Sequence, residues 1–432
     1  MGEQRQVELS IETLTHGGRG LGFCDGKAVF VPLTAPGDRV LARVCQEKKR
    51  YCSAELIEIL EPSDLRQTPP CPRFGDCGGC QWQHLSYQQQ LAWKERIYFD
   101  LLGRSGLATN GQLQAIMPAP QQFHYRNRVQ FKCRMTADGF VIGFYRAGQH
   151  FVVDTECCLL LMPAVQRILT LLRCTMERAP RPDAVPQVDV TCGDDDAVQL
   201  VVHLLPDAVM AMRPWLQDLA RQHDLTLSLQ VGRKDSLRRI HGGSDQVLNL
   251  PSSGVSLRVR AGGFAQINPQ QNRVLVETVC RLAGLNGSER VLDLFCGAGN
   301  FSLPLARNAR WVDGVEAFAP AIEDACHNAV ANGIDNVAFH AEDATEAIAR
   351  LWTKEDYDLV VLDPPRSGCY AVIGELVRRR PARIIYVSCD PATLARDLHP
   401  LMGGGYRLVV SQPCDMFPQT WHVESVCLLQ RS

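Results

Sequence analysis

The sequence predicts an α/β domain at the C-terminal end of the chain, preceded by a small β-barrel and a β-rich central region. After about residue 270, apolar segments such as RVLDLFCG, DLVVLDPP and RIIYVSCD alternate with amphipathic helical segments. This alternation is typical of a parallel sheet that is covered by helices. Residues 123–260 contain mainly strand-like segments, among them RVQFKCRM and LTLSLQVG. We therefore expect three domains, at residues 1–62, 63–262 and 263–432.

The first domain is predicted to be an OB-like β-barrel. Val7, Leu9 and Ile11 alternate with polar residues, and the turn-rich segment THGGRGLG follows them. The segments AVFVP, DRVLARV and AELIEIL continue the pattern to about residue 60. Short strands that are separated by Gly-rich turns are typical of small barrels.

The composition excludes several classes of protein. The chain has 432 residues, of which 46% are hydrophobic. No apolar run reaches the ~18 residues that a membrane-spanning helix needs, and the start, MGEQRQVELS, lacks the apolar segment of a secretory signal. The 18 cysteines are too sparse for the disulfide framework of a small secreted domain. We expect a cytoplasmic protein with mostly reduced thiols, no membrane partner and a monomeric state.

Positive charge is concentrated in one part of the chain. The net charge is only −2, but residues 86–150 carry eight Lys and Arg against three acidic residues. Aromatic residues are interleaved with these charges, a composition that suits RNA phosphates and stacked bases. An ordinary solvated surface is the alternative. The candidate RNA contacts are Tyr125, Arg126, Arg128 and residues 144–146.

A glycine-rich turn follows the first apolar strand of the C-terminal domain. In VLDLFCGAGNFSLPLA, residues 291–306, Asp293 lies at the end of the strand, and Gly297 and Gly299 allow a tight turn. The spacing D-x-x-x-G-x-G lacks the third glycine of a nucleotide-binding Rossmann turn. It looks like the S-adenosylmethionine site of Rossmann-like methyltransferases; a purely structural turn is the alternative. Glu316, at the end of the next strand, is placed to hold ribose hydroxyls.

Two further segments fit the same type of site. Asp343 could face the adenine ring, and LDPPR, residues 362–366, occupies the place of a substrate-facing motif in those enzymes.

Three cysteines lie close together in CPRFGDCGGC. Cys71, Cys77 and Cys80 have the spacing C-x5-C-x2-C, which is too dense for ordinary core residues. Both zinc and an iron–sulfur cluster accept four thiolates, so a distant fourth cysteine is needed. Cys157 and Cys158, in TECCLLLMP, are the candidates.

One cysteine follows a buried strand directly. In YVSCDPATLARD, Cys389 ends an apolar run and is followed by an acid, a proline and a helical segment. A small core residue is one explanation. The other is a nucleophile at the carboxyl end of a strand, where open α/β sheets keep their sites.

These motifs together resemble the bacterial RNA uracil-C5-methyltransferases, most closely the enzymes that act on large-subunit rRNA. The resemblance covers nearly the whole chain and implies a TRAM module, a β-rich iron–sulfur domain and a catalytic domain. It implies that Cys71, Cys77 and Cys80 bind a [4Fe-4S] cluster. Cys158 fits the family spacing to Pro163 better than Cys157 does, although Leu159 stands where proline is common.

The same resemblance assigns the catalytic domain. It implies a nucleophile at Cys389, with Asp390 where many relatives carry Asn, and a base at Glu424 in the motif HVES. The residues that it implies for the methyl donor or the uracil edge are Gln266, Phe295, Asn300, Glu316, Asp343 and Asp363.

The implied chemistry explains why a thiol and an acid are needed. A thiolate that adds to C6 of uracil makes C5 nucleophilic, and a base must then remove the C5 proton. We expect the pKa of Cys389 to be lowered. The uridine must leave any base stack to reach the thiol, so we expect a single-stranded or loop uridine. The resemblance implies that this uridine lies in 23S rRNA.

Two alternatives stay open. The first is a tRNA uracil-C5-methyltransferase, although we expect tRNA enzymes to be shorter and to lack the TRAM-like segment and the cysteine cluster. The second is a non-catalytic RNA-binding ribosome-assembly factor, which would not need Cys389, Glu424 or the glycine turn. Cytosine-C5 methylation is disfavoured because Ser388, and not proline, precedes Cys389.

Overall fold

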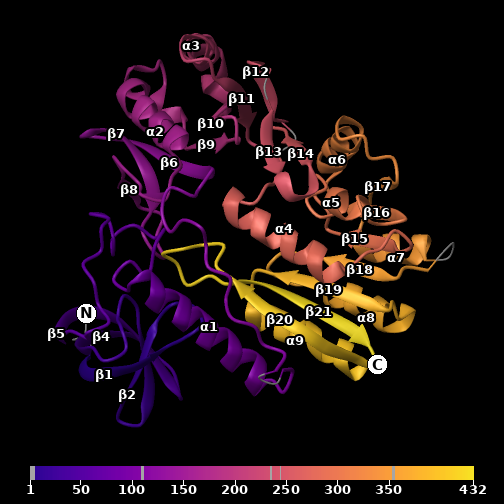
Figure 1. Cartoon of the computed structure of the whole chain (residues 1–432). Coiled ribbons are helices and arrows are strands. Elements are labelled where there is room, and N and C mark those ends of the chain that lie inside the picture. Colours follow the sequence, from indigo (N-terminus) through magenta and orange to yellow (C-terminus); the bar gives the residue numbers. More distant parts are fainter. Residues whose placement is uncertain (1–4, 109–110, 234–235, 244, 353–355) are drawn as a thin grey trace.

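The computed structural model describes residues 5–108, 111–233, 236–243, 245–352 and 356–432. The N-terminal part is a closed five-stranded barrel with the strand order β1-β2-β3-β5-β4, shown in indigo in Figure 1. Alternating apolar residues such as Val7, Leu9 and Ile11 fill its interior. The strands of the barrel are β1 (Gln6–Leu14), β2 (Gly20–Cys24), β3 (Lys27–Val31), β4 (Arg39–Glu47) and β5 (Tyr51–Glu61).

The central region is built on a seven-stranded sheet with the order β12-β11-β10-β9-β6-β7-β8. Helices α2 (Pro163–Thr175) and α3 (Val209–Gln222) contribute to its core. Its strands are β6 (Arg128–Thr136), β7 (Gly139–Tyr145), β8 (Val152–Asp154), β9 (Gln187–Cys192), β10 (Val198–Leu204), β11 (Thr226–Val231) and β12 (Arg238–His241). Short 3-10 helices span Met176–Arg178, Pro182–Ala184, Pro206–Ala208 and Pro251–Ser253.

The C-terminal part is a seven-stranded sheet with the order β17-β16-β15-β18-β19-β21-β20. Its first five strands are parallel, and β21 runs antiparallel to β19. The strand order reverses between β15 and β18, the place where open α/β sheets bind their ligands. The strands are β15 (Arg290–Leu294), β16 (Trp311–Glu316), β17 (Val337–Ala341), β18 (Leu359–Leu362), β19 (Arg383–Ser388), β20 (Tyr406–Cys414) and β21 (Glu424–Arg431).

Helices cover both faces of this sheet. One core combines the sheet with α4, α5 and α6 and the hairpin β13–β14; the other combines it with α7, α8 and α9. The bounds are β13 (Gln246–Leu250), β14 (Val255–Val259), α4 (Pro269–Ala283), α5 (Ser302–Ala306), α6 (Ala319–Ala331), α7 (Ala344–Leu351), α8 (Tyr370–Arg379) and α9 (Pro391–Gly403).

Helix α1 (Tyr87–Arg104) lies between the barrel and the C-terminal sheet (Figure 1). Ser86 caps it by accepting a hydrogen bond from the Gln89 backbone. Tyr98 and Leu102, one helical turn apart, are buried in the core that contains α8 and α9. The helix therefore joins the first half of the chain to the C-terminal sheet.

The predicted barrel and the α/β domain are confirmed. The domain boundaries at 62/63 and 262/263 stay a prediction. None of the helices within the described residues is long and apolar enough to cross a membrane.

Candidate active site and cysteine site

Cys389 and Glu424 lie opposite each other at the edge of the C-terminal sheet. Ser388 is the last residue of β19, and its partner in the antiparallel ladder is Ser425 of β21. Cys389 and Glu424 are the next residues beyond this last pair, and the charge of Glu424 acts on the Cys389 thiol. The Ser425 hydroxyl donates a hydrogen bond to the Ser388 carbonyl at 3.3 Å, which holds the two strand ends together.

The local sequence explains the sharp turn after Cys389. Asp390 is the N-cap of α9, and its carboxylate accepts a hydrogen bond from the Thr393 backbone at 2.8 Å. Pro391 occupies the first helical position, where its fixed φ suits a helix start. The chain thus changes from strand to helix within two residues and leaves the half-buried Cys389 at the sheet edge.

Asp363 lies at the same edge, one strand away. It follows β18, and its backbone donates a hydrogen bond to the carbonyl of Leu294, the last residue of β15. Burial and the neighbouring charge of Asp293 raise the pKa of Asp363 to about 7. The three predicted residues Cys389, Glu424 and Asp363 are therefore brought together.

The expected low pKa of Cys389 is wrong for the protein without substrate. Burial, followed by the charge of Glu424, raises the pKa of the Cys389 thiol to about 12, with a smaller contribution from Asp363. The pKa of Glu424 is raised well above its ordinary value by its own burial and by Asp363. Desolvation disfavours both charged forms, and neighbouring negative charges add to it. The helix start beside Cys389 does not outweigh these effects.

Arg366 lies in the segment LDPPR that was predicted to face the substrate, but it was not assigned a role of its own. Its positive charge lowers the pKa of both Cys389 and Glu424, against the larger effects of burial. It is exposed, in the loop that begins at Asp363. Its position three residues after Asp363, in the LDPPR motif, was the signal that could have identified it.

The glycine-rich turn after β15 has the backbone geometry of a ligand-binding turn. Phe295 has a φ of +67°, and Gly297 and Gly299 have φ values of +55° and +94°. A Cβ atom at Gly297 would meet no other heavy atom within 4 Å, so the backbone is open on that side. Asp293 is fully buried, accepts a hydrogen bond from Ser302, and has a pKa raised to about 7, chiefly by burial. A carboxylate with one paired and one unpaired oxygen at this turn fits a polar ligand above the sheet.

The other predicted cofactor residues surround the same edge. Asn300 exchanges two hydrogen bonds with Asn272 of α4, at 2.8 and 3.0 Å, which fixes its amide. Glu316, the last residue of β16, accepts a hydrogen bond from the Phe318 backbone. Asp343 follows β17 and is exposed, but its carboxylate caps α7. Gln266 is partly buried in the segment before α4.

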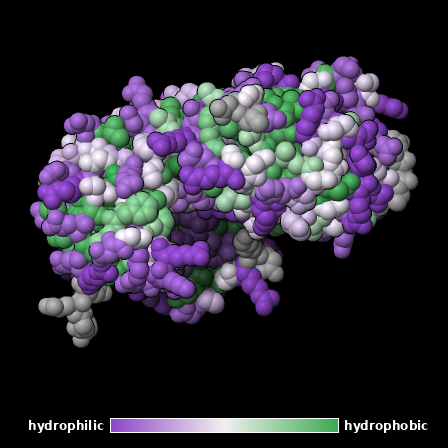
Figure 2. Space-filling view, turned by 90° about the horizontal axis from the view of Figure 1, so that it is seen from below, coloured by the Kyte–Doolittle hydropathy of each residue, from purple (hydrophilic) through white to green (hydrophobic). Residues whose placement is uncertain are grey.

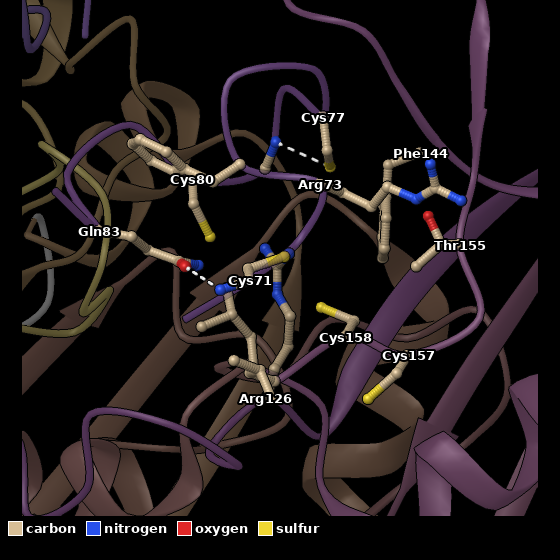
Figure 3. Close-up of a pocket in the computed structure, with 14 residues that line it drawn as sticks. Cys71, Arg73, Cys77, Cys80, Gln83, Arg126, Phe144, Thr155, Cys157 and Cys158 are labelled. Atoms are coloured by element: carbon tan, nitrogen blue, oxygen red, sulfur yellow. Dashed lines mark hydrogen bonds between the residues drawn. The ribbon is translucent and has the colours of Figure 1, made fainter. Parts of the chain in front are cut away.

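A second site lies where the cysteine segment meets the central sheet. Cys71, Cys77, Cys80, Cys157 and Cys158 all line one cavity. Figure 3 shows that the sulfur atoms of Cys71, Cys80 and Cys158 face the space between them, whereas the sulfur of Cys157 points elsewhere. Cys157 is exposed.

Backbone contacts hold the cysteine segment against β7. Gly78 donates a hydrogen bond to the Tyr145 carbonyl at 2.9 Å. A Cβ atom at this position would lie 2.9 Å from that carbonyl oxygen, so only glycine allows the close approach. The Gly79 backbone donates a hydrogen bond to the Cys77 sulfur at 3.4 Å, shown as a dashed line in Figure 3.

The thiols of this site influence one another. Burial, with smaller contributions from the neighbouring cysteines, raises the pKa of Cys80 to about 12 and that of Cys158 to about 11. The charge of Arg126 acts in the opposite direction on Cys158 and Cys77. Bringing buried thiols and one cation together suits a group that takes up thiolates.

The positions of these cysteines can be compared with the ligand sets of a single metal ion and of an iron–sulfur cluster. Within the described parts of the chain, no three Cys, His, Asp or Glu side chains are grouped as ligands of a single ion. A [4Fe-4S] cluster takes four cysteines on separate irons, so its ligands need only face a common space. A zinc ion instead needs its four ligands within about 2.3 Å of the metal.

The structure corrects part of the predicted RNA surface. Tyr125 is buried, and its hydroxyl donates a hydrogen bond to the Pro418 carbonyl, so its assignment as an RNA contact is wrong. Arg128 donates to the Gly263 carbonyl at 2.7 Å, and Arg126 faces the cysteines. Some residues of the basic segment 86–150 therefore make contacts inside the protein.

A groove lies between the barrel and α1. It has a volume of about 920 Å³ and is lined by His16 and Arg19 of the barrel, Arg104 of α1, and Trp421. Figure 2 shows a hollow surrounded by hydrophilic side chains on the face seen from below. His16, one of the lining residues, lies 3.7 Å from the carboxylate of Asp390, the neighbour of Cys389.

Two family models match the chain. One, described as tRNA (uracil-5-)-methyltransferase, matches residues 87–432. The other, described as the TRAM domain of tRNA (uracil(54)-C(5))-methyltransferase, matches residues 7–65.

Individual relatives match over almost their full length. The 23S rRNA (uracil(1939)-C(5))-methyltransferase RlmD of Alkalilimnicola ehrlichii is 37% identical over 98% of this chain and 96% of its own. The enzyme of the same name from Xanthomonas euvesicatoria is 35% identical over 99% of this chain and 98% of its own.

A solved structure matches the fold. The tRNA (uracil-54, C5)-methyltransferase of Pyrococcus abyssi, crystallised with S-adenosyl-L-homocysteine, superposes with a TM-score of 0.77. It is 26% identical, and the match covers 98% of this chain and 99% of that one. The expectation that tRNA enzymes lack the TRAM-like segment and are shorter is therefore wrong. The chain belongs to the tRNA (uracil-5-)-methyltransferase family of S-adenosylmethionine-dependent RNA methyltransferases.

Proposed function

We propose that this protein methylates C5 of a uridine in 23S rRNA through a covalent bond between Cys389 and C6 of the uracil. The observation that carries the proposal is that Cys389 and Glu424 follow directly on the last pair of the β19–β21 ladder, Ser388 with Ser425, and that the charge of Glu424 acts on the Cys389 thiol. A nucleophile and a base that flank one point can act on adjacent ring atoms, here C6 and C5. The turn after β15 lies at the same edge and can present the methyl donor to C5.

The proposed reaction has three steps. The Cys389 sulfur bonds to C6, and the electrons of the C5–C6 double bond make C5 nucleophilic. C5 then takes the methyl group as the S–CH3 bond of the sulfonium breaks, which leaves S-adenosylhomocysteine. Glu424 removes the C5 proton, and the electrons of that C–H bond expel the Cys389 sulfur from C6.

The charges of the site suit these roles. Burial raises the pKa of Glu424, and a carboxylate with a raised pKa is a stronger base than an ordinary one. Arg366 is the cation that favours the thiolate of Cys389. Asp363, whose pKa burial raises to about 7, can donate or accept a hydrogen bond at the uracil edge near neutral pH.

For the methyl donor, we assign S-adenosylmethionine to the carboxyl ends of β15, β16 and β17. Phe295 and Asn300 flank the open glycine turn, Glu316 lies at the next strand end, and Asp343 at the one after it. Gln266 lies in the segment before α4. S-Adenosylmethionine supplies an electrophilic methyl group on a sulfonium.

We assign a [4Fe-4S] cluster to Cys71, Cys77, Cys80 and Cys158. The support is the cavity that the four residues share, the exposure of Cys157, and the hydrogen bond that the Cys77 sulfur accepts. Hydrogen bonds to the sulfurs and solvent exclusion are the means by which a protein tunes such a cluster. The cluster would cross-link the cysteine segment to the central sheet.

The identity of the target RNA is the most specific part of the proposal. Relatives at 35–37% identity over nearly the whole chain are named as 23S rRNA enzymes, which favours rRNA. The 26% identical structural neighbour is a tRNA enzyme, so tRNA is the second candidate. The groove between the barrel and α1 can hold either RNA.

One assay separates these possibilities. The protein is incubated with methyl-labelled S-adenosylmethionine and unmodified 23S or tRNA transcripts, and the nucleosides are analysed. We expect labelled 5-methyluridine in 23S RNA only. Label in tRNA only would move the target to tRNA, and 5-methylcytidine would overturn the chemistry. RNA binding without any methylation would favour an assembly factor.

A further inference from the structure

A nine-residue connection, 415–423, leads directly into Glu424. It joins β20 to β21, and the last pair of that ladder is Cys414 with Glu424. Asp415 is thus the first residue of the connection and lies next to the pair that contains Glu424. The geometry of Glu424 depends on how this connection is held.

A buried ion pair holds the start of the connection. The Lys94 ammonium of α1 donates a hydrogen bond to the Asp415 carboxylate at 2.5 Å, and both side chains are fully buried. The same ammonium donates to the Phe417 carbonyl at 3.0 Å. Lys94 therefore fixes two points of the connection at once, and its charge does not reach solvent.

Further contacts fix the middle of the connection. Gln419 has a left-handed backbone, with a φ of +70°. Its side chain and backbone NH make two hydrogen bonds with the side chain of Gln90, one turn before Lys94 on α1, each at 2.9 Å. Its carbonyl accepts hydrogen bonds from Gln81 and Trp82, each at 3.1 Å. Helix α1 and residues 81–82 therefore both hold this segment.

Burying a lysine and an aspartate is an unusual way to hold a loop. A buried ion pair contributes little net stability compared with apolar residues of similar size. It does hold two groups in a defined geometry, because misplacing either leaves a charge without a partner. That property suits a residue that must be held close to a reacting atom.

We propose that Lys94 and Asp415 position Glu424 for removal of the C5 proton. They are positioning residues, since neither faces Cys389 across the ladder. The inference rests on the proposed role of Glu424 as the base. It predicts that loss of the pair slows elimination and leaves the earlier bond formation and methyl transfer less affected.

The test measures how RNA divides between product and covalent adduct. Full-length protein is incubated with 23S transcript and methyl-labelled S-adenosylmethionine, quenched in denaturant and resolved on a denaturing gel. A methyl-labelled slow band reports RNA attached to Cys389. For Lys94→Met and Asp415→Asn we expect at least about tenfold more adduct per turnover than in the wild type, because a displacement of about 1 Å can cost 100-fold in rate.

Matched variants separate positioning from stability. Tyr98→Phe removes a buried hydroxyl from the next turn of α1, whose partners are Ser411 of β20 and Cys427 of β21, outside the connection. It lowers stability but should leave the adduct fraction unchanged. Lys94→Met/Asp415→Leu removes both charges, so it should fold even where a single variant does not, and it should still accumulate adduct.

The outcomes distinguish the inference from the function on which it rests. Glu424→Gln serves as the reference for blocked elimination. If Glu424→Gln accumulates adduct while Lys94→Met and the double variant match Tyr98→Phe, the positioning role is wrong and the base assignment stands. If Glu424→Gln itself forms no adduct, the base assignment fails first.

Discussion

The two cysteine sites of this protein differ in what surrounds their thiols. At the catalytic edge, one thiol, Cys389, faces carboxylates, and Glu424 is the largest charged influence on its pKa. At the cysteine site, Cys80 and Cys158 face other thiols, and those are the charges that raise their pKa further. Burial is the largest cause of the raised thiol pKa at both sites. A raised thiol pKa therefore does not by itself identify the function of a cysteine, whereas the side chains around the thiol do.

The sites also differ in how the chain assembles them. The catalytic residues come from neighbouring strand ends of one sheet, so the ladder itself sets their positions. The cysteines come from an irregular segment and from a second segment far along the chain, joined by contacts such as Gly78 to Tyr145. We expect the first site to keep its shape without a ligand, and the second to depend on its bound group.

The largest effect is expected from Cys389→Ala. Turnover should fall by about 10⁴-fold or more, the range seen when a catalytic nucleophile is removed. The affinity for S-adenosylmethionine should stay within about threefold, because the thiol acts on the base and not on the donor. Activity is measured with labelled donor, and binding by calorimetry.

Iron content serves as the control for that variant. Cys389→Ala should contain as much iron as the wild type, because Cys389 belongs to the other site. Turnover close to the wild-type value would remove Cys389 from the mechanism. A parallel loss of iron would mean that the two sites are not separate.

The second-largest effect is expected when the fourth cysteine of the proposed cluster is replaced. Anaerobically purified protein should contain about four irons and be brown. Cys158→Ser should lose most of the iron and lower the thermal stability, whereas Cys157→Ser should retain both, because Cys157 is exposed and points elsewhere. Iron analysis and the visible spectrum provide the measurement.

The reverse pattern at these two positions would move the ligand to Cys157. Stoichiometric zinc in a colourless sample would replace the cluster by a zinc site.

The sequence predicted the parts of the fold that follow from local pattern. Apolar segments followed by Asp363 and Cys389 indicated strand ends, and strand ends of a parallel sheet meet at one edge. The opposition of Cys389 and Glu424 also depends on the antiparallel pairing of β21 with β19, which no local pattern shows.

The surface was harder to predict than the sheet. Lys94 counted toward a basic patch in the sequence, but its charge is fully buried against Asp415, 321 residues away. Tyr125 is buried in the same way against Pro418. Long-range pairing of this kind removes charges and rings from the surface without any trace in the neighbouring sequence.

A smaller effect is expected at Arg366. Its charge lowers the pKa of Cys389, so Arg366→Gln should raise that pKa and reduce the thiolate fraction at every pH below about 12. Alkylation of Cys389 by iodoacetamide should slow about two- to fivefold between pH 8 and 9, since half a pKa unit changes the thiolate fraction about threefold. Site-resolved mass spectrometry follows Cys389 among the other cysteines.

Arg378→Gln, which removes an exposed arginine of α8, is the matched control and should leave the alkylation rate unchanged. Faster alkylation of Cys389 in Arg366→Gln would show that another group governs the thiol.

The most direct test of the paired roles of Cys389 and Glu424 is the fate of RNA bound to Glu424→Gln. If Cys389 attacks C6 and Glu424 removes the C5 proton, this variant should stall with RNA attached to Cys389 and already methylated. A denaturing gel should then show a slow band that carries the methyl label, and Cys389→Ala/Glu424→Gln should show none. Free methylated RNA formed at the wild-type rate, or no methyl label transferred at all, would contradict the account.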